Sequence, residues 1–177
     1  MSSEPYERWQ VDLVDMQKYK SPQNRHTSYL LTVVDCFSKY AWAIPLTNKS
    51  GPSVAAAMQR ILDSQRRGPR IIQSDNGSEF EAEFARLLAS RNISHIKSRP
   101  YNPQANGQIE RFNGTLKRMI RGHLTANRTK TYIPVLEQLL RGYNSIPHTS
   151  TGVAPVDLHR SADNTQHQQV ARRLGRK

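Results

Sequence analysis

The chain has 177 residues, of which 36% are hydrophobic, so it is long enough for one domain with a real core. Its 26 Lys and Arg against 14 Asp and Glu give a net charge of +12, which favours a polyanionic partner, most often nucleic acid. The single cysteine, Cys36, excludes an internal disulfide and any zinc site with two or more thiolates, and we expect neither a membrane span nor a secretory signal.

The positive charge is concentrated in the second half of the chain. Residues 1–99 carry 14 Lys and Arg against 10 Asp and Glu, a net +4, whereas residues 100–177 carry 12 against 4, a net +8. We expect the second half to contact the polyanion, although a merely soluble basic protein is the plainer alternative.

Three strands are predicted at the start of the chain. Residues 1–8 are polar and expected to be disordered. Alternation over residues 9–14 predicts a first strand, and the β-branched run at 29–34 predicts a second. A third strand is predicted at 40–44 and expected to end at Pro45.

Helices and strands then alternate. Apolar residues at helical spacing predict helices at about 50–64 and 79–90, and short apolar runs predict strands at 70–73 and 93–96. This order, with three meandering strands first, predicts an α/β mixed sheet with helices on its faces.

The last third is predicted to be helical. A loop rich in Pro and Asn, 99–106, leads to a long helix at about 107–124 and another at 132–143, with a turn near 155–160. We place one domain at residues 9–160, and we expect the polar, basic tail 161–177 to be disordered.

Three carboxylates fall on three separate predicted elements. Asp12 lies mid-strand, Asp75 follows the 70–73 strand, and Glu110 lies early in the long helix. Acidic side chains that converge repel one another, so the simplest reason to keep them together is a divalent cation. Two Mg²⁺ ions about 3.5–4 Å apart activate an attacking oxygen and stabilise a leaving oxygen at a phosphodiester.

Each carboxylate also has a plainer interpretation. Asp12 is a half-exposed residue of an amphipathic strand, Asp75 begins an Asp-Asn-Gly turn, and Glu110 is a solvated helical glutamate within reach of Lys117. From the residues alone, both interpretations stay open.

The long helix carries a polar stripe beside its apolar face. At 100° per residue, the apolar face comprises Ile109, Phe112, Leu116, Met119 and Ile120. The adjoining stripe comprises Asn106, Glu110, Asn113, Lys117 and Arg121. The helix therefore buries one face and presents amides, a carboxylate and two cations beside it.

Several short motifs are separated along the chain. They are Trp9–Asp12, Val33–Tyr40, Ser74–Phe80, Asn102–Asn113, Tyr143–Asn144, Pro147–His148 and Thr151–Pro155. In this order they resemble the catalytic core of retroviral-type DDE integrases, over roughly residues 6–160. The sequence around Asp12–Met16 and Tyr29–Asp35 is most similar to Maverick/Polinton-like or gypsy-like element integrases.

The resemblance implies an RNase H-like fold, a five-stranded mixed sheet flanked by helices. It implies that Asp12, Asp75 and Glu110 are both the catalytic triad and the ligands of Mg²⁺, with Mn²⁺ as a substitute. The implied activity is that of a two-metal polynucleotidyl transferase, which processes DNA 3′ ends and performs strand transfer.

The resemblance also implies DNA contacts. Ser78 matches a position near target DNA, Asn106 a loop position near the active site, and Lys117 a position that contacts DNA ends. We assign Asn113 and Arg121 to the same DNA-binding stripe, with Asn113 supporting the site. Element ends and target DNA are the expected partners, a homodimer or higher assembly the expected state, and the nucleus the expected compartment.

Two departures from the family pattern bear on these expectations. The spacing from Asp75 to Glu110 is one residue shorter than the usual retroviral spacing. Complete integrases carry a His/Cys zinc domain before the core and a DNA-binding domain after it, so we interpret this chain as an isolated core.

Two other functions compete with the integrase interpretation. A domesticated, catalytically silent core acting as a DNA- or protein-binding module is the main alternative. A nuclease for RNA–DNA hybrids is disfavoured by the Pro103–Gly107 loop, which belongs to the integrase pattern.

Overall fold

A computed structural model describes residues 2, 4–98 and 106–175. Its centre is one five-stranded sheet in the order β3-β2-β1-β4-β5, in which β1 is antiparallel to β2 and parallel to β4. The sheet is therefore mixed, as expected. The strands are β1 Arg8–Asp15, β2 Tyr29–Asp35, β3 Ala41–Leu46, β4 Ile71–Ser74 and β5 Ser94–Lys97.

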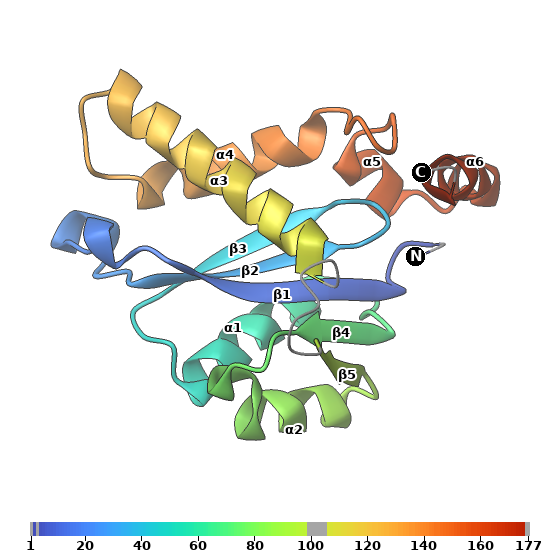
Figure 1. Ribbon diagram of the computed structural model, residues 1–177, viewed down its shortest axis with the longest axis horizontal. Helices are drawn as coiled ribbons and strands as arrows, with labels where there is room; N and C mark the ends of the chain where they lie inside the picture. Colours follow the sequence, from blue (N-terminus) through green and yellow to red (C-terminus); the bar gives the residue numbers. More distant parts are fainter. Residues whose placement is uncertain (1, 3, 99–105, 176–177) are drawn as a thin grey trace.

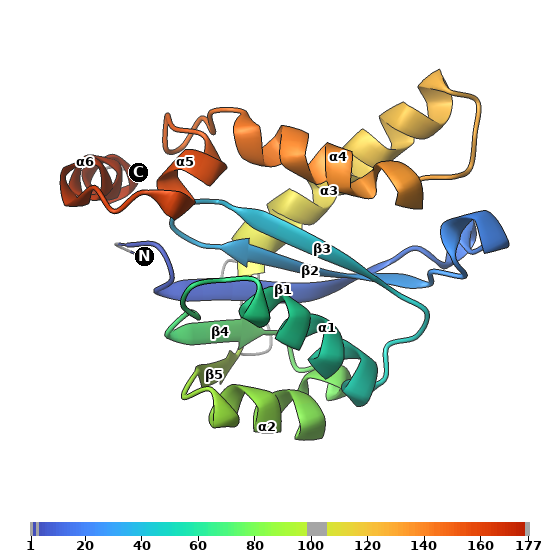
Figure 2. The ribbon, with the colours of Figure 1, turned by 180° about the vertical axis from the view of Figure 1, so that it is seen from behind.

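Helices cover both faces of the sheet. The first pair, α1 (Gly51–Asp63) and α2 (Ala82–Ser90), lies on one face, and the second pair, α3 (Gly107–Ala126) and α4 (Ile133–Ser145), lies on the other (Figures 1 and 2). Two further helices, α5 and α6, follow at one end of the molecule. The remaining elements are α5 Pro155–Arg160, α6 Asn164–Gly175 and the short 3₁₀ turns η1 Gln17–Tyr19, η2 Pro22–Asn24 and η3 Ser78–Phe80.

Alternation along the central strands builds two hydrophobic clusters. On β2, Leu31 and Val33 face α1 and α2, whereas Leu30 and Val34 face α3 and α4. Both faces of this strand are buried, which explains its uninterrupted apolar run. None of the helices in the described residues is both long and apolar enough to cross a membrane.

Two predicted boundaries are wrong for local reasons. Pro45 does not end the third strand, because β3 runs to Leu46 and pairs Pro45 with Leu30. Since β3 is an edge strand, the missing N–H of a proline is tolerated there. The helix expected from residue 79 is divided into η3 and α2, which begins at Ala82. Most of the loop predicted at 99–106 lies outside the described residues.

The termini, expected to be disordered, are partly ordered. Tyr6 packs on His159, with ring centroids 4.5 Å apart. In the tail, α6 buries Val170 and Leu174 in a small cluster with Phe37 and Leu158. This mostly polar segment contains two apolar residues at helical spacing, and their burial provides the free energy that orders the helix.

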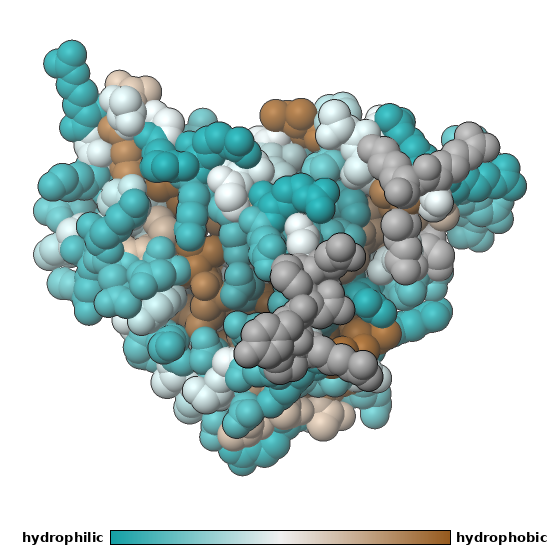
Figure 3. All heavy atoms as spheres, in the orientation of Figure 1, coloured by the Kyte–Doolittle hydropathy of each residue, from teal (hydrophilic) through white to brown (hydrophobic). Residues whose placement is uncertain are grey.

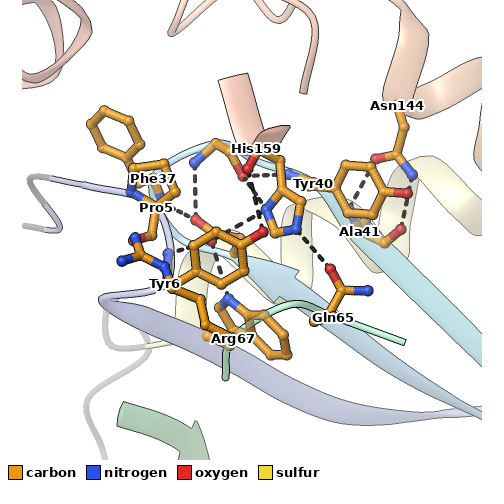
Figure 4. A network of polar contacts seen from close by, with 12 residues as sticks. Pro5, Tyr6, Phe37, Tyr40, Ala41, Gln65, Arg67, Asn144 and His159 are labelled. Atoms are coloured by element: carbon orange, nitrogen blue, oxygen red, sulfur yellow. Dashed lines mark hydrogen bonds and ion pairs between the residues drawn. The ribbon is translucent and has the colours of Figure 1, made fainter. Parts of the chain in front are cut away.

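A buried carboxylate joins these terminal segments to the sheet. Asp35 is fully buried and accepts hydrogen bonds from the Tyr6 amide at 2.9 Å and the Trp9 indole at 3.1 Å. It also accepts from the amides of Phe37 and Ser38 at 2.8 and 2.9 Å. On α5, His159 places Nδ1 3.7 Å from the Asp35 carboxylate, and Figure 4 shows the rings of Tyr6 and Tyr40 beside His159.

The hydrogen bonds outweigh the burial of Asp35. Burial alone would raise its pKa, but the hydrogen bonds from His159, Tyr6 and Ser38 lower the pKa by more than burial raises it. The pKa therefore lies below the ordinary value. A carboxyl with a depressed folded-state pKa stabilises the fold above its unfolded-state pKa of about 4, and that contribution is lost as the pH falls through the folded-state value.

We therefore predict that Asp35→Asn lowers the free energy of unfolding by about 3 kcal/mol or more at pH 7. The neutral side-chain amide of asparagine would replace a buried carboxylate that accepts from several N–H donors. The loss shrinks as the pH falls below about 4. Urea denaturation between these pH values measures both effects. The exposed Asp63, paired with Arg91, gives the control Asp63→Asn, with an expected change below about 1 kcal/mol. Equal losses in the two variants would contradict the account.

Candidate active site

The start of α3 is fixed to the sheet by side chains from β1 and β4. The first amides of a helix lack intrahelical acceptors. Here the Ile109 amide donates to Gln10 Oε1, on β1, at 3.0 Å. One turn earlier, Asn106 Oδ1 accepts from Gln73 Nε2 at 3.2 Å and from Ser98 Oγ at 2.7 Å. These bonds hold the first turn of α3 against the sheet.

Asp12 lies on the same face of β1 as Gln10, because residues two apart on a strand share a face. Its Oδ2 accepts from Asn113 Nδ2 at 2.8 Å, and its Oδ1 accepts from the Leu13 amide at 2.8 Å. Burial raises the pKa of Asp12 to about 6, and the negative charges of Asp75 and Glu110 raise it as well. The Leu13 amide and Lys117 act in the opposite direction. All three predicted carboxylates therefore share one electrostatic neighbourhood.

The topology explains how Asp75 and Glu110 reach this neighbourhood. The parallel pairing of β1 with β4 ends at Gln10 and Gln73, and Asp12 and Asp75 each follow two residues later, Asp75 just beyond the end of β4. Asp75 is exposed, and its Oδ1 accepts from the Gly77 amide at 2.9 Å, so it also makes the expected turn. Glu110 is exposed in the first turn of α3, directly after Ile109.

The carboxylates do not share a coordination geometry. Over residues 4–98 and 106–175, no three His, Cys, Asp or Glu side chains lie close enough together to hold a metal ion. The chemistry of the donors nevertheless fits Mg²⁺, which prefers oxygen ligands. Beside Asp12, Asn113 Oδ1 is a buried oxygen that finds no hydrogen-bond partner among the described residues, a further oxygen acceptor next to the acidic side chains.

The predicted DNA-binding residues do not form a single surface. Lys117 and Arg121 are exposed and line a hollow of about 490 Å³ together with Lys18 and Tyr19. The Lys18 ammonium lies 4.7 Å from the centre of the Tyr19 ring. Figure 3 shows that the face crossed by α3 is mainly hydrophilic, with apolar surface in separate small areas.

Three other predicted residues lie around the carboxylates. Ser78 is exposed at the start of η3, just after the Asp75 turn. Asn106 is half-buried in its hydrogen bonds to Gln73 and Ser98. Asn113 is only 7% exposed and is directed at Asp12, so it supports a carboxylate instead of facing solvent.

Sequence reasoning missed Gln10 and Lys18. A signal for Gln10 was available, because it shares the strand face of Asp12 and a buried glutamine must find hydrogen-bond partners. Lys18 lies between the first two predicted strands, and no local pattern connects it with α3.

Family models agree on one assignment. Two models, each described as an integrase core domain, match residues 2–103 and 91–155. A transposon-derived protein of Caenorhabditis elegans is 30% identical over 150 residues, which cover 85% of this chain and 52% of that protein. The Pro-Pol polyprotein of feline foamy virus is 26% identical over 157 residues, 88% of this chain and 13% of that protein.

A transposon polyprotein is similar as well. The Tf2-3 polyprotein of Schizosaccharomyces pombe is 28% identical over 160 residues, 89% of this chain and 12% of that protein. The chain thus spans about half the length, or less, of these relatives.

Solved structures confirm the fold. A chain of the simian T-cell lymphotropic virus intasome in complex with PP2A regulatory subunit B56 gamma superposes with a TM-score of 0.80 at 25% identity, covering 92% of this chain and 57% of that one. The HTLV-2 integrase catalytic core domain in complex with magnesium gives a TM-score of 0.72 at 22% identity, with coverage of 89% and 98%. The RNase H-like architecture expected from the sequence is therefore confirmed.

The attachment of α3 to β1 leads to a prediction. Gln10→Leu leaves the buried Ile109 amide without its acceptor, and we expect the free energy of unfolding to fall by about 1–3 kcal/mol. Hydrogen exchange should accelerate at the Ile109 amide. Gln59→Leu, on the exposed side of α1, is the matched control and should change stability by less than about 0.5 kcal/mol. Unchanged protection of Ile109 would show that Gln10 does not anchor the helix.

Proposed function

Because the chain belongs to the integrase core domain family, we propose that it is the catalytic core of a metal-dependent DNA integrase, which processes DNA 3′ ends and joins them to target DNA. One observation carries the proposal. Asp12 is half-buried beside α3, and its pKa is raised by burial and by the charges of Asp75 and Glu110, as expected where acids gather to receive a cation.

In this proposal Asp12, Asp75 and Glu110 hold Mg²⁺, or Mn²⁺ as a substitute. When bound, the metal supplies Lewis-acid activation of the attacking oxygen and offsets charge at the phosphodiester. The protein orients the ligands: Asn113 holds the Asp12 carboxylate, and Gln10 holds the turn that carries Glu110.

Binding of DNA relies on the basic surface beside the carboxylates. Lys18, Lys117 and Arg121 line one hollow and attract backbone phosphates. Ser78 and Asn106 lie at the opposite border of the site, toward β4, and contact DNA there in this proposal. With a net charge of +12, affinity should fall steeply with salt.

We extend the proposal to the biological setting. The chain acts on element ends and target DNA in the nucleus, as a homodimer or larger assembly, and derives from a Maverick/Polinton-like or gypsy-like element. The similarity to polyproteins of Tf2 transposons and foamy virus supports an origin in a mobile element. The HTLV-2 core has been solved in both dimeric and trimeric forms, which supports self-association.

One observation favours a second function. Since no three acidic side chains of the described residues share the reach of one ion, a catalytically silent core that binds DNA or protein is the alternative. The two functions differ in whether Glu110 matters for chemistry.

We predict that Glu110→Gln reduces cleavage and joining of a labelled DNA end by at least about 100-fold in Mg²⁺, because loss of one carboxylate removes about 3 kcal/mol of transition-state stabilisation. Glu137→Gln is the matched control: Glu137 is exposed on α4 and paired with Arg141, so activity should not change. Cleavage that survives in the Glu110 variant would favour the silent core.

A second prediction tests metal binding by a measurement that does not depend on activity. If about 10 mM Mg²⁺ binds with a Kd of about 1 mM, the melting temperature should rise by about 3–5 °C. Asp12→Asn removes a ligand and should reduce the rise to below about 1 °C. Thermal denaturation in Mg²⁺ and in KCl of equal ionic strength separates binding from screening. Equal rises in both proteins would argue against Asp12 as a ligand.

A further inference from the structure

A second hollow lies on the other flank of α3. It has a volume of about 490 Å³, and its walls come from the β2–β3 turn, α3, α4, the loop that follows α4, and α6. We call it the basic hollow. Its polar and aromatic walls include Lys39, Arg111, Thr115, Arg118, Tyr143 and His148, and no Asp or Glu of the described chain lines it.

Lys39 is held rigidly at the base of the basic hollow. The residue is 8% exposed, and its backbone has a φ of +66°, which is uncommon for a residue with a side chain. Its ammonium group donates to the Cys36 carbonyl and, at 2.8 Å, to Gln108 Oε1. Burial lowers the pKa of Lys39, and the charge of Arg111 lowers it too, although Cys36 and Asp35 act in the opposite direction. An anion in the hollow would relieve both unfavourable effects.

Two arginines supply the remaining positive charge of the basic hollow. Arg111 and Arg118 are exposed and seven residues apart on α3, which places them on one side of the helix. Among the described residues neither forms an ion pair, and Arg118 donates to the Thr115 hydroxyl at 3.2 Å. Three cations thus surround one hollow without a carboxylate, an arrangement that electrostatic repulsion disfavours unless an anion binds.

The chemistry of the walls favours phosphate over carboxylate. Guanidinium groups match phosphate with paired hydrogen bonds, and the Ser150 hydroxyl lies in the same wall. Phe112 and Tyr143, with ring centroids 5.0 Å apart, supply apolar wall surface on which a nucleotide can pack.

We infer that the basic hollow binds a backbone phosphate of a DNA strand, as a contact separate from the carboxylate site. The inference rests on the proposed function and deepens it. Arg111 directly follows Glu110 and lies about 100° around the helix from it. A strand held here runs along the flank of α3 opposite Asn113, so the two sides of one helix bind different stretches of DNA.

The test measures the affinity of the full chain for a fluorescein-labelled DNA duplex by anisotropy, from about 0.05 to 0.2 M salt. The double variant Arg111→Gln/Arg118→Gln should bind at least about 10-fold more weakly at the lower salt, and the slope of log affinity against log salt should fall by about 2. The control Arg70→Gln/Arg141→Gln removes the same charge from exposed, ion-paired sites and should stay within about two-fold with an unchanged slope.

Two further arms separate the possible failures. Equal loss of affinity in both double variants would overturn the basic hollow while leaving the proposed function intact, provided that Glu110→Gln still abolishes cleavage. Selective loss in the Arg111/Arg118 variant, together with a wild type that never cleaves, would support the hollow and count against the enzyme. Polyglutamate that displaces DNA more effectively than an unlabelled duplex of equal charge would overturn the assignment to phosphate.

Discussion

The site depends on a match in register between α3 and β1. Gln10 and Asp12 lie two residues apart on the strand, a rise of about 6.8 Å, and contact Ile109 and Asn113, which are four residues apart on the helix, a rise of about 6 Å. The two hydrogen bonds therefore reinforce each other. Glu110 lies between the two helical contacts, so its backbone position follows from them.

This register places negative charges together at a cost. Asp12 is half-buried, and its pKa is raised to about 6 by burial first and then by the charges of Asp75 and Glu110. A bound cation would offset this repulsion, and the surrounding positive surfaces would offset the charge of a polyanion. Two kinds of charged group therefore lie around α3: carboxylates on the side that faces β1, and cations that line hollows on both of its flanks.

The sequence predicted the features that follow from local pattern. Period-two alternation identified β1 and placed Asp12 in the middle of it, and the helical stripe placed Glu110 beside the apolar face of α3. What failed depends on distant partners. Asn113 lies at the edge of the stripe, and only the docked sheet shows that it is buried. Arg111 and Arg118 belong to neither the apolar face nor the polar stripe predicted for this helix, and nothing near them in sequence places Lys39 beside them. The order in α6 likewise requires Phe37, far away in the chain.

We propose that this register lets three acids, from a strand, a loop and a helix, hold one cation. Anomalous scattering from crystals soaked in Mn²⁺ tests it most directly. The account predicts a difference peak bounded by the carboxylate oxygens of Asp12, Asp75 and Glu110. Mn²⁺ bound elsewhere on the molecule, with no peak between these three side chains, would contradict it.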